Sequence, residues 1–179
     1  MSNTSPSGVG ISFNVQPHAY DPATTPEYFA GVLTRRALAF LIDVVIIAAL
    51  VAFTAAVIFA LGFVTLGLGW LLFFLLPTTT VIWAVLYNGF TLGSPASATI
   101  GMRVMEIEMR TWYGAPAYFV LGAVHAVVFW ISVSTLTPLI LLLGLFNERK
   151  RLLHDFLLGT VVVNNTARAA ALRGVRPHF

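Results

Sequence analysis

The chain has 179 residues, of which 58% are hydrophobic and 9% are charged, and its mean hydropathy is +0.87. Soluble domains have roughly 45–50% apolar and about 25% charged residues, so this composition excludes an ordinary soluble domain and a disordered chain. Asp43 is the only formal charge from Ala37 to Met102. The sequence therefore predicts a membrane protein.

The net charge is +3 and there is no cysteine, which excludes disulfides and thiolate metal sites. The basic residues flank hydrophobic segments instead of forming a basic face with interleaved aromatics, so anionic lipid headgroups are expected as partners and nucleic acid is not. The sequence has no phosphate-binding glycine loop, nucleophile elbow or HExxH motif. We therefore expect no enzyme activity, cofactor or bound metal.

Residues 1–27 are rich in Ser, Thr, Pro and Gly and are predicted to form a disordered cytoplasmic tail. Ala37–Ala60 follows as the first membrane span, with a length of about 36 Å as a helix against a hydrocarbon core of about 30 Å. A row of alanines at every fourth position of this span suits close helix packing, although alanine is also simply frequent in such helices. The row consists of Ala48, Ala52, Ala56 and Ala60.

Leu61–Gly69 is predicted to be a turn, and Trp70–Phe90 a second span that Pro77 bends. Alternation of apolar and charged residues over Arg103–Arg110 predicts a strand. A second strand is expected at 160–163, and the two are predicted to pair into a small cytoplasmic β-ribbon, since isolated strands leave backbone groups unpaired.

Residues 115–146 are apolar, but one helix of 32 residues would measure about 48 Å and exceed a single crossing. We expect a break at 132–138, where hydroxyl residues precede Pro138, and hence a short or re-entrant hairpin. Residues 165–179 are predicted to form a basic cytoplasmic tail. This tail is either a frayed end or a short helix that lies on anionic lipid. With basic residues kept on the cytoplasmic side, both termini are predicted to be cytoplasmic.

Asp43 lies seven residues into the first span, where an acid costs about 2.5–3.5 kcal/mol on insertion scales, so it requires compensation. Arg36 shares its helix face two turns away, and Asp155 is placed to meet Arg36. Two interpretations of Arg36, Asp43 and Asp155 remain open: an ion or ligand site, or a structural charge network.

Three further residues are secondary candidates: His125, His154 and Arg103. His125 lies in an apolar stretch, where a histidine is either hydrogen-bonded across helices or part of a proton relay. His154 beside Asp155 suggests a metal or hydrolase site, but the sequence shows no second His-Asp pair in range, which argues against it.

The chain resembles the RDD family of integral membrane proteins in three ordered segments: Ala30–Asp43, Thr99–Val104 and Arg151–Val163. The resemblance covers about 28–164 and assigns the family's arginine and two aspartates to Arg36, Asp43 and Asp155. The chain departs from the family pattern at Met102, where a basic residue is common. The resemblance implies a multi-pass protein of the bacterial cytoplasmic membrane, in a family for which transport is proposed.

The predicted fold is an all-α membrane protein, with a helical hairpin of two full spans, a second short or re-entrant hydrophobic hairpin and the small β-ribbon. The leading functional hypothesis is transport or sensing of a small ion or ligand through the Arg/Asp network. Its rival is a non-catalytic accessory or assembly subunit of a larger membrane complex. As partners, a second copy of the chain or a larger membrane complex is expected. A membrane-embedded enzyme or a lipid-binding factor is a third, weaker possibility.

Overall fold

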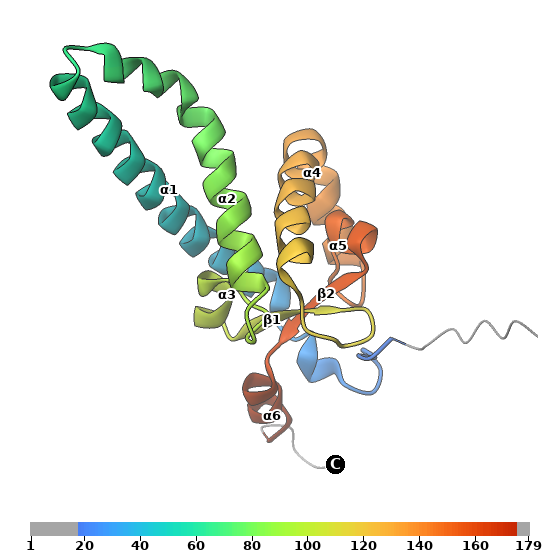
Figure 1. Ribbon diagram of the computed structural model, residues 1–179. Coiled ribbons are helices and arrows are strands. Elements are labelled where there is room, and N and C mark those ends of the chain that lie inside the picture. The colour runs from blue at the N-terminus through green and yellow to red at the C-terminus, as the bar shows by residue number, and fades with distance from the viewer. Residues whose placement is uncertain (1–17, 175–179) are drawn as a thin grey trace, which may run out of the picture.

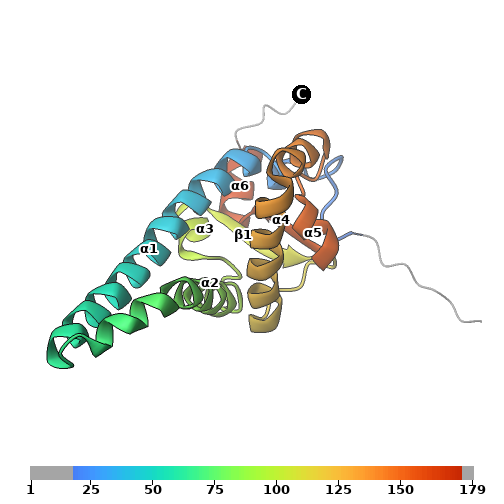
Figure 2. The same ribbon diagram turned by 90° about the horizontal axis from the view of Figure 1, so that it is seen from above.

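The structure is a computed structural model that describes residues 18–174, apart from the side chains of 133, 135–143 and 145. A long helical hairpin projects from a region that contains a small sheet and shorter helices (Figure 1). The hairpin consists of α1 (Val32–Val64), the 3₁₀ helix η2 (Leu68–Leu75) and α2 (Leu76–Leu92). Both arms are long and apolar enough to cross a membrane, by length and composition. Seen from above, they extend side by side away from the rest of the molecule (Figure 2).

The hairpin differs from the prediction at its boundaries. Helix α1 begins five residues before Ala37 and continues past Ala60 to Val64, so its turn is shorter than the expected Leu61–Gly69. Pro77 lies in the first turn of α2, directly after η2, so the expected second span changes from 3₁₀ to α-helix at the proline. The 3₁₀ segment η2 replaces the first part of the expected second span.

The predicted β-ribbon is present, with β1 (Ile107–Thr111) antiparallel to β2 (Thr160–Asn164) and Met109 opposite Val162. The first strand begins later than expected because Ile100–Val104 forms the short helix α3, which Thr99 caps by accepting the Met102 N–H. All five residues of β2 and three of the five of β1 are buried, so the sheet is largely covered by the rest of the protein.

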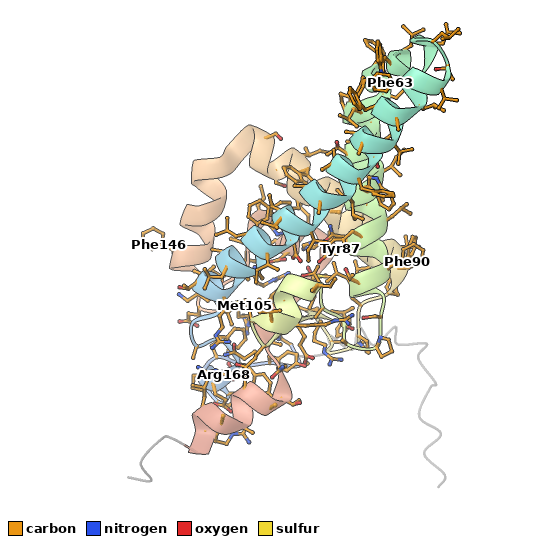
Figure 3. The ribbon with its side chains drawn as sticks, turned by 90° about the vertical axis from the view of Figure 1, so that its left-hand side faces the viewer. Phe63, Tyr87, Phe90, Met105, Phe146 and Arg168 are labelled. Atoms are coloured by element: carbon orange, nitrogen blue, oxygen red, sulfur yellow. The ribbon has the colours of Figure 1, made fainter. Side chains whose placement is uncertain are left out.

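Helix α4 (Phe119–Phe146) is helical through the expected break, but its ribbon arches over and descends to Phe146 (Figure 3). Its two ends lie at the same end of the hairpin. A Cβ at Gly122 would fall 2.7 Å from the Asn88 carbonyl oxygen near the end of α2, and one at Gly144 would fall 3.1 Å from Leu33 near the start of α1. Since a straight 28-residue helix would span about 42 Å, α4 must double back. Pro138, which removes a backbone donor, explains a bend at this place.

The two predicted tails are partly ordered. Residues 1–17 and 175–179 lie outside the described residues. Tyr20 and Tyr28 pack on a core cluster that includes Val161 and Val163 of the sheet, which explains why part of the expected 1–27 tail is structured. The basic C-terminal segment forms α6 (Thr166–Gly174), the helical one of its two interpretations.

Buried charge ties the two terminal segments together. Glu27 lies in the 3₁₀ helix η1 (Pro26–Tyr28), is 3% exposed and pairs at 2.6 Å with Arg173 of α6. The Asn164 side chain donates to the Glu27 carbonyl oxygen. Composition alone suggested tails in these regions, whereas their long-range contacts order both.

Candidate functional site

Asp43 accepts three hydrogen bonds at the base of the hairpin. Its Oδ1 accepts the Tyr87 hydroxyl at 2.5 Å and the Gly101 N–H at 2.8 Å, and its Oδ2 accepts the Thr99 hydroxyl at 2.6 Å. The Tyr87 oxygen in turn accepts the Ile100 N–H. One carboxylate therefore joins α1 to α2 and to the start of α3.

The close approach of α3 to α1 requires a glycine at position 101. A Cβ there would lie 2.2 Å from the Ala39 carbonyl oxygen and 2.8 Å from Asp43 Oδ1. The Gly101 N–H can reach the carboxylate only because this space is free. The compensation that the sequence requires for Asp43 thus comes from hydroxyl and backbone donors, and Arg36, two turns away on the same helix, contacts Asp155 instead.

Arg36 pairs with Asp155, at 2.5 Å between Nη1 and Oδ2. This contact between α1 and α5 (Leu153–Leu158) is the one expected from the sequence. Asp155 is fully buried and also accepts the Leu152 N–H on Oδ2. The other guanidinium nitrogen of Arg36 lies 3.2 Å from His154 Nε2.

Two histidines complete the cluster around Asp155. His125 from α4 places Nε2 3.3 Å from Asp155 Oδ1, and His154 places Nε2 3.6 Å from the same oxygen. The two imidazole rings are 4.8 Å apart and nearly perpendicular. The structure therefore brings together His125 and His154, which lie 29 positions apart in the sequence. We call Arg36, His125, His154 and Asp155 the Arg–His–Asp cluster.

Arg151 supports this cluster from behind, a role that the sequence did not indicate. It is 3% exposed and donates to the backbone oxygens of Thr160 and Asp155, both at 2.8 Å. Its guanidinium also lies over the Trp112 and Phe156 rings. Arg151 therefore fixes α5 against β2 through backbone acceptors, and leaves the Asp155 carboxylate to Arg36.

The environment keeps Asp155 charged and His154 neutral. Burial by itself raises the pKa of Asp155, but Arg36 and the hydrogen bond from His125 hold it well below its ordinary value. Burial lowers the pKa of His154 to about 3, despite the nearby Asp155 charge. A neutral His154 offers a lone pair at Nε2, in agreement with the Arg36 donor that faces it.

The lowered pKa values of His154 and Asp155 predict that acid destabilises the fold. The unfolded chain takes up a proton at His154 below about pH 6.5, whereas the folded chain does not until about pH 3. The free energy of unfolding should fall by up to about 1.4 kcal/mol per pH unit across this window. Asp155 adds a further loss below its unfolded value of 3.8. Thermal unfolding in detergent from pH 7.5 to 4.5 measures this, and His154→Gln should flatten the dependence. An unchanged slope in His154→Gln would contradict the assignment.

A cleft of about 480 Å³ opens beside the Arg–His–Asp cluster, lined mainly by α1 and α4, with further residues from α2, α3, α5 and the sheet. Its walls are mostly apolar. Its polar lining residues are Arg36, Asp43, Asn88, Thr99, His125 and His154. Arg36 and Asp43, two of the three charged candidates, therefore line the same cleft as His125 and His154.

The remaining predicted residues lie away from this cleft. Arg103 donates to the Ala98 carbonyl oxygen and to Ser94 Oγ at 2.7 Å, so it holds the loop before α3. The alanine row of α1 is exposed and does not pack against α2. The buried residues of α1 near the tip of the hairpin are instead Ile58 and Gly62. Gly62 packs directly against Trp70 of η2, since a Cβ at Gly62 would overlap the Trp70 ring.

Fold and site together define a helical, membrane-type domain with a buried charge cluster at the base of an apolar hairpin. The chain belongs to the RDD family, whose family model matches residues 30–159. The match includes Arg36, Asp43 and Asp155 and ends just before β2. No curated protein and no solved structure matches the chain.

Proposed function

We propose that the protein spans the bilayer with the α1–α2 hairpin and binds a small amphipathic ligand in the cleft, in order to transport or sense it. The observation that carries the proposal is the cleft itself, with apolar walls and one polar side. Its volume lies within the roughly 300–1,000 Å³ typical of small-molecule sites.

The polar side suits a ligand with a hydrogen-bonding end. The Arg36 and Asp155 charges balance, so the cluster offers directed donors and acceptors without a large net charge. Phe40, Phe129 and Trp130 face the same cleft and suit an apolar body. A ligand of this shape enters from the lipid more readily than from water.

The proposed orientation places the sheet and both termini in the cytoplasm. Arg35 at the start of α1, and Arg149 and Lys150 after α4, lie at the sheet end of the hairpin. Basic residues beside membrane segments favour the cytoplasmic side. The doubled-back α4 then re-enters without placing charge on the other face, as in a bacterial cytoplasmic-membrane protein.

Filling the cleft should block binding. Ala37 is exposed and lines the cleft, so Ala37→Trp places a ring in it without crowding a packed core. The probe is a dansyl-labelled C11 fatty acid, titrated by fluorescence against the protein in nanodiscs. We expect Ala37→Trp to weaken binding by about tenfold or more, which corresponds to at least about 1.4 kcal/mol.

The control is Leu41→Trp, one turn further along α1 at a 58% exposed position that does not line the cleft. It should bind like the unmodified chain. Equal affinity of Ala37→Trp and Leu41→Trp would contradict binding in the cleft.

A second candidate function, an accessory subunit or a self-associating chain, is favoured by the exposed alanine row on α1. Small residues in such a row allow close helix approach, and nothing within the described residues covers it. Ala52→Leu should abolish co-purification of one defined partner or a cross-linked second copy. Ala49→Leu, at another exposed alanine outside the row, should retain it. If both variants keep the association, the row is not the interface.

A further inference from the structure

Three side chains of types that can ligate a metal converge beside the cleft, one from α4 and two consecutive ones from α5. One ligand atom each of His125, His154 and Asp155 lies within 4.8 Å of the other two. Around Asp155 Oδ1 the two Nε2 atoms stand at 3.3 and 3.6 Å. In a tetrahedral site with bonds of about 2.0–2.1 Å, neighbouring ligand atoms are separated by about 3.3 Å. Two of the three ligand separations are thus already close to those of a metal site, and the third pair of ligand atoms lies within 4.8 Å.

The hydrogen bonds at His154 indicate a lone pair at Nε2. Arg36 has only donors, so its N–H at 3.2 Å from Nε2 requires an unprotonated nitrogen there. The proton is then on Nδ1, which is buried and has no hydrogen-bond partner among the described residues. A neutral imidazole with a lone pair at Nε2 is the form in which a histidine ligates a metal.

The Asp155 carboxylate is also oriented so that one oxygen can ligate a metal. Arg36 and the Leu152 N–H hold Asp155 Oδ2, and Oδ1 is left toward the histidines, with only a long contact from the Thr160 hydroxyl. Such outer partners orient metal-ligating carboxylates. Both histidines line the cleft, so a fourth ligand can reach a metal held by these three side chains.

We propose that His125, His154 and Asp155 bind one divalent transition-metal ion of the zinc class, with its open coordination position toward the cleft. Imidazole and carboxylate ligands suit zinc, cobalt and nickel ions. On binding, Arg36 gives up its contact with His154 and keeps its pair with Asp155, and His125 takes the tautomer with its proton on Nδ1, which frees Nε2 for the metal. Because the Arg36 charge opposes a nearby dication, an anionic fourth ligand such as hydroxide is favoured. The site goes beyond the proposed function and does not depend on it.

The test is Co²⁺ titration of the full chain, purified without a polyhistidine tag and stripped with EDTA. We expect one Co²⁺ per chain with visible absorption bands of a four- or five-coordinate site, which equimolar Zn²⁺ abolishes. His125→Gln removes one ligand and leaves the Arg36–Asp155 pair, and it should weaken binding more than about tenfold. His18→Gln, at a histidine beside Trp112, should bind like the unmodified chain.

Histidine modification by diethyl pyrocarbonate provides a readout that requires no variant. Zn²⁺ should protect His125, whose side chain is 13% exposed, and should leave His18 equally reactive. Absence of Co²⁺ binding by the unmodified chain, or His125 labelling that Zn²⁺ does not change, overturns the proposal. Fatty-acid binding in the cleft, measured separately, would still stand in that case.

Discussion

Asp43→Ala should abolish most accumulation of the protein in the membrane. The substitution removes the acceptor of three donors, from Tyr87, Thr99 and Gly101. Each donor left without a partner in a low-dielectric environment costs about 1–3 kcal/mol. The combined loss of several kcal/mol is a large fraction of the typical 5–15 kcal/mol stability of a domain. Membrane level by immunoblot and thermal unfolding in detergent measure it.

Asp43→Asn should give an intermediate result, because the remaining amide oxygen can still accept from Tyr87 and Gly101. Val45→Ala is the control on the same helix, at a side chain that is 68% exposed and leaves no donor unpaired. We expect the order Val45→Ala, Asp43→Asn, Asp43→Ala in decreasing stability. If Asp43→Ala accumulates and unfolds like Val45→Ala, the carboxylate does not organise the hairpin base.

Arg36→Met should destabilise the fold by about 3–5 kcal/mol, the range for removing one partner of a buried ion pair. The substitution keeps the apolar stem but leaves the fully buried Asp155 without its guanidinium. Arg36→Lys should restore part of the loss, since it returns the charge without the second contact to His154. Denaturant unfolding of the purified protein in detergent provides the comparison.

A double-mutant cycle with Asp155→Asn separates the pair from its surroundings. If the two side chains stabilise each other, Arg36→Met combined with Asp155→Asn should cost clearly less than the sum of the single changes. Additive effects would show that Arg36 and Asp155 act independently. The Arg151 contacts go to backbone oxygens and remain in all three variants.

Much of the fold follows from patterns that the sequence displays locally. The long apolar runs predict the α1–α2 hairpin, and the alternation around Ile107 and Met109 predicts β1. Their exact ends depend on local contacts that composition does not reveal. Examples are the capping of α3 by Thr99 and the position of Pro77 in the first turn of α2.

The site was predictable only in part, because its contacts join residues that are distant in the sequence. The need for compensation at Asp43 follows from its place in an apolar segment, but its actual partners come from α2 and the loop before α3. Tyr87 carried no signal beyond that of an aromatic residue near the end of a span. His125 and His154 are distant in sequence and meet because α4 doubles back against α5. Tertiary convergence of this kind leaves no local pattern.

The proposed function requires that the hairpin crosses the bilayer and leaves the Arg–His–Asp cluster at the cytoplasmic end. Phe63 marks the far end of the hairpin, and Arg168 lies at the opposite end of the molecule (Figure 3). Because the chain has no cysteine, single cysteines can be introduced at Leu66, which is 96% exposed at the tip, and at Ala167 on α6.

Labelling of these variants in intact cells with a membrane-impermeant maleimide tests the claim most directly. The account predicts that Leu66→Cys reacts at once, whereas Ala167→Cys reacts only after the membrane is permeabilised. Reaction of both positions in intact cells, or of neither until permeabilisation, would place the two ends on the same side and contradict a membrane-spanning hairpin.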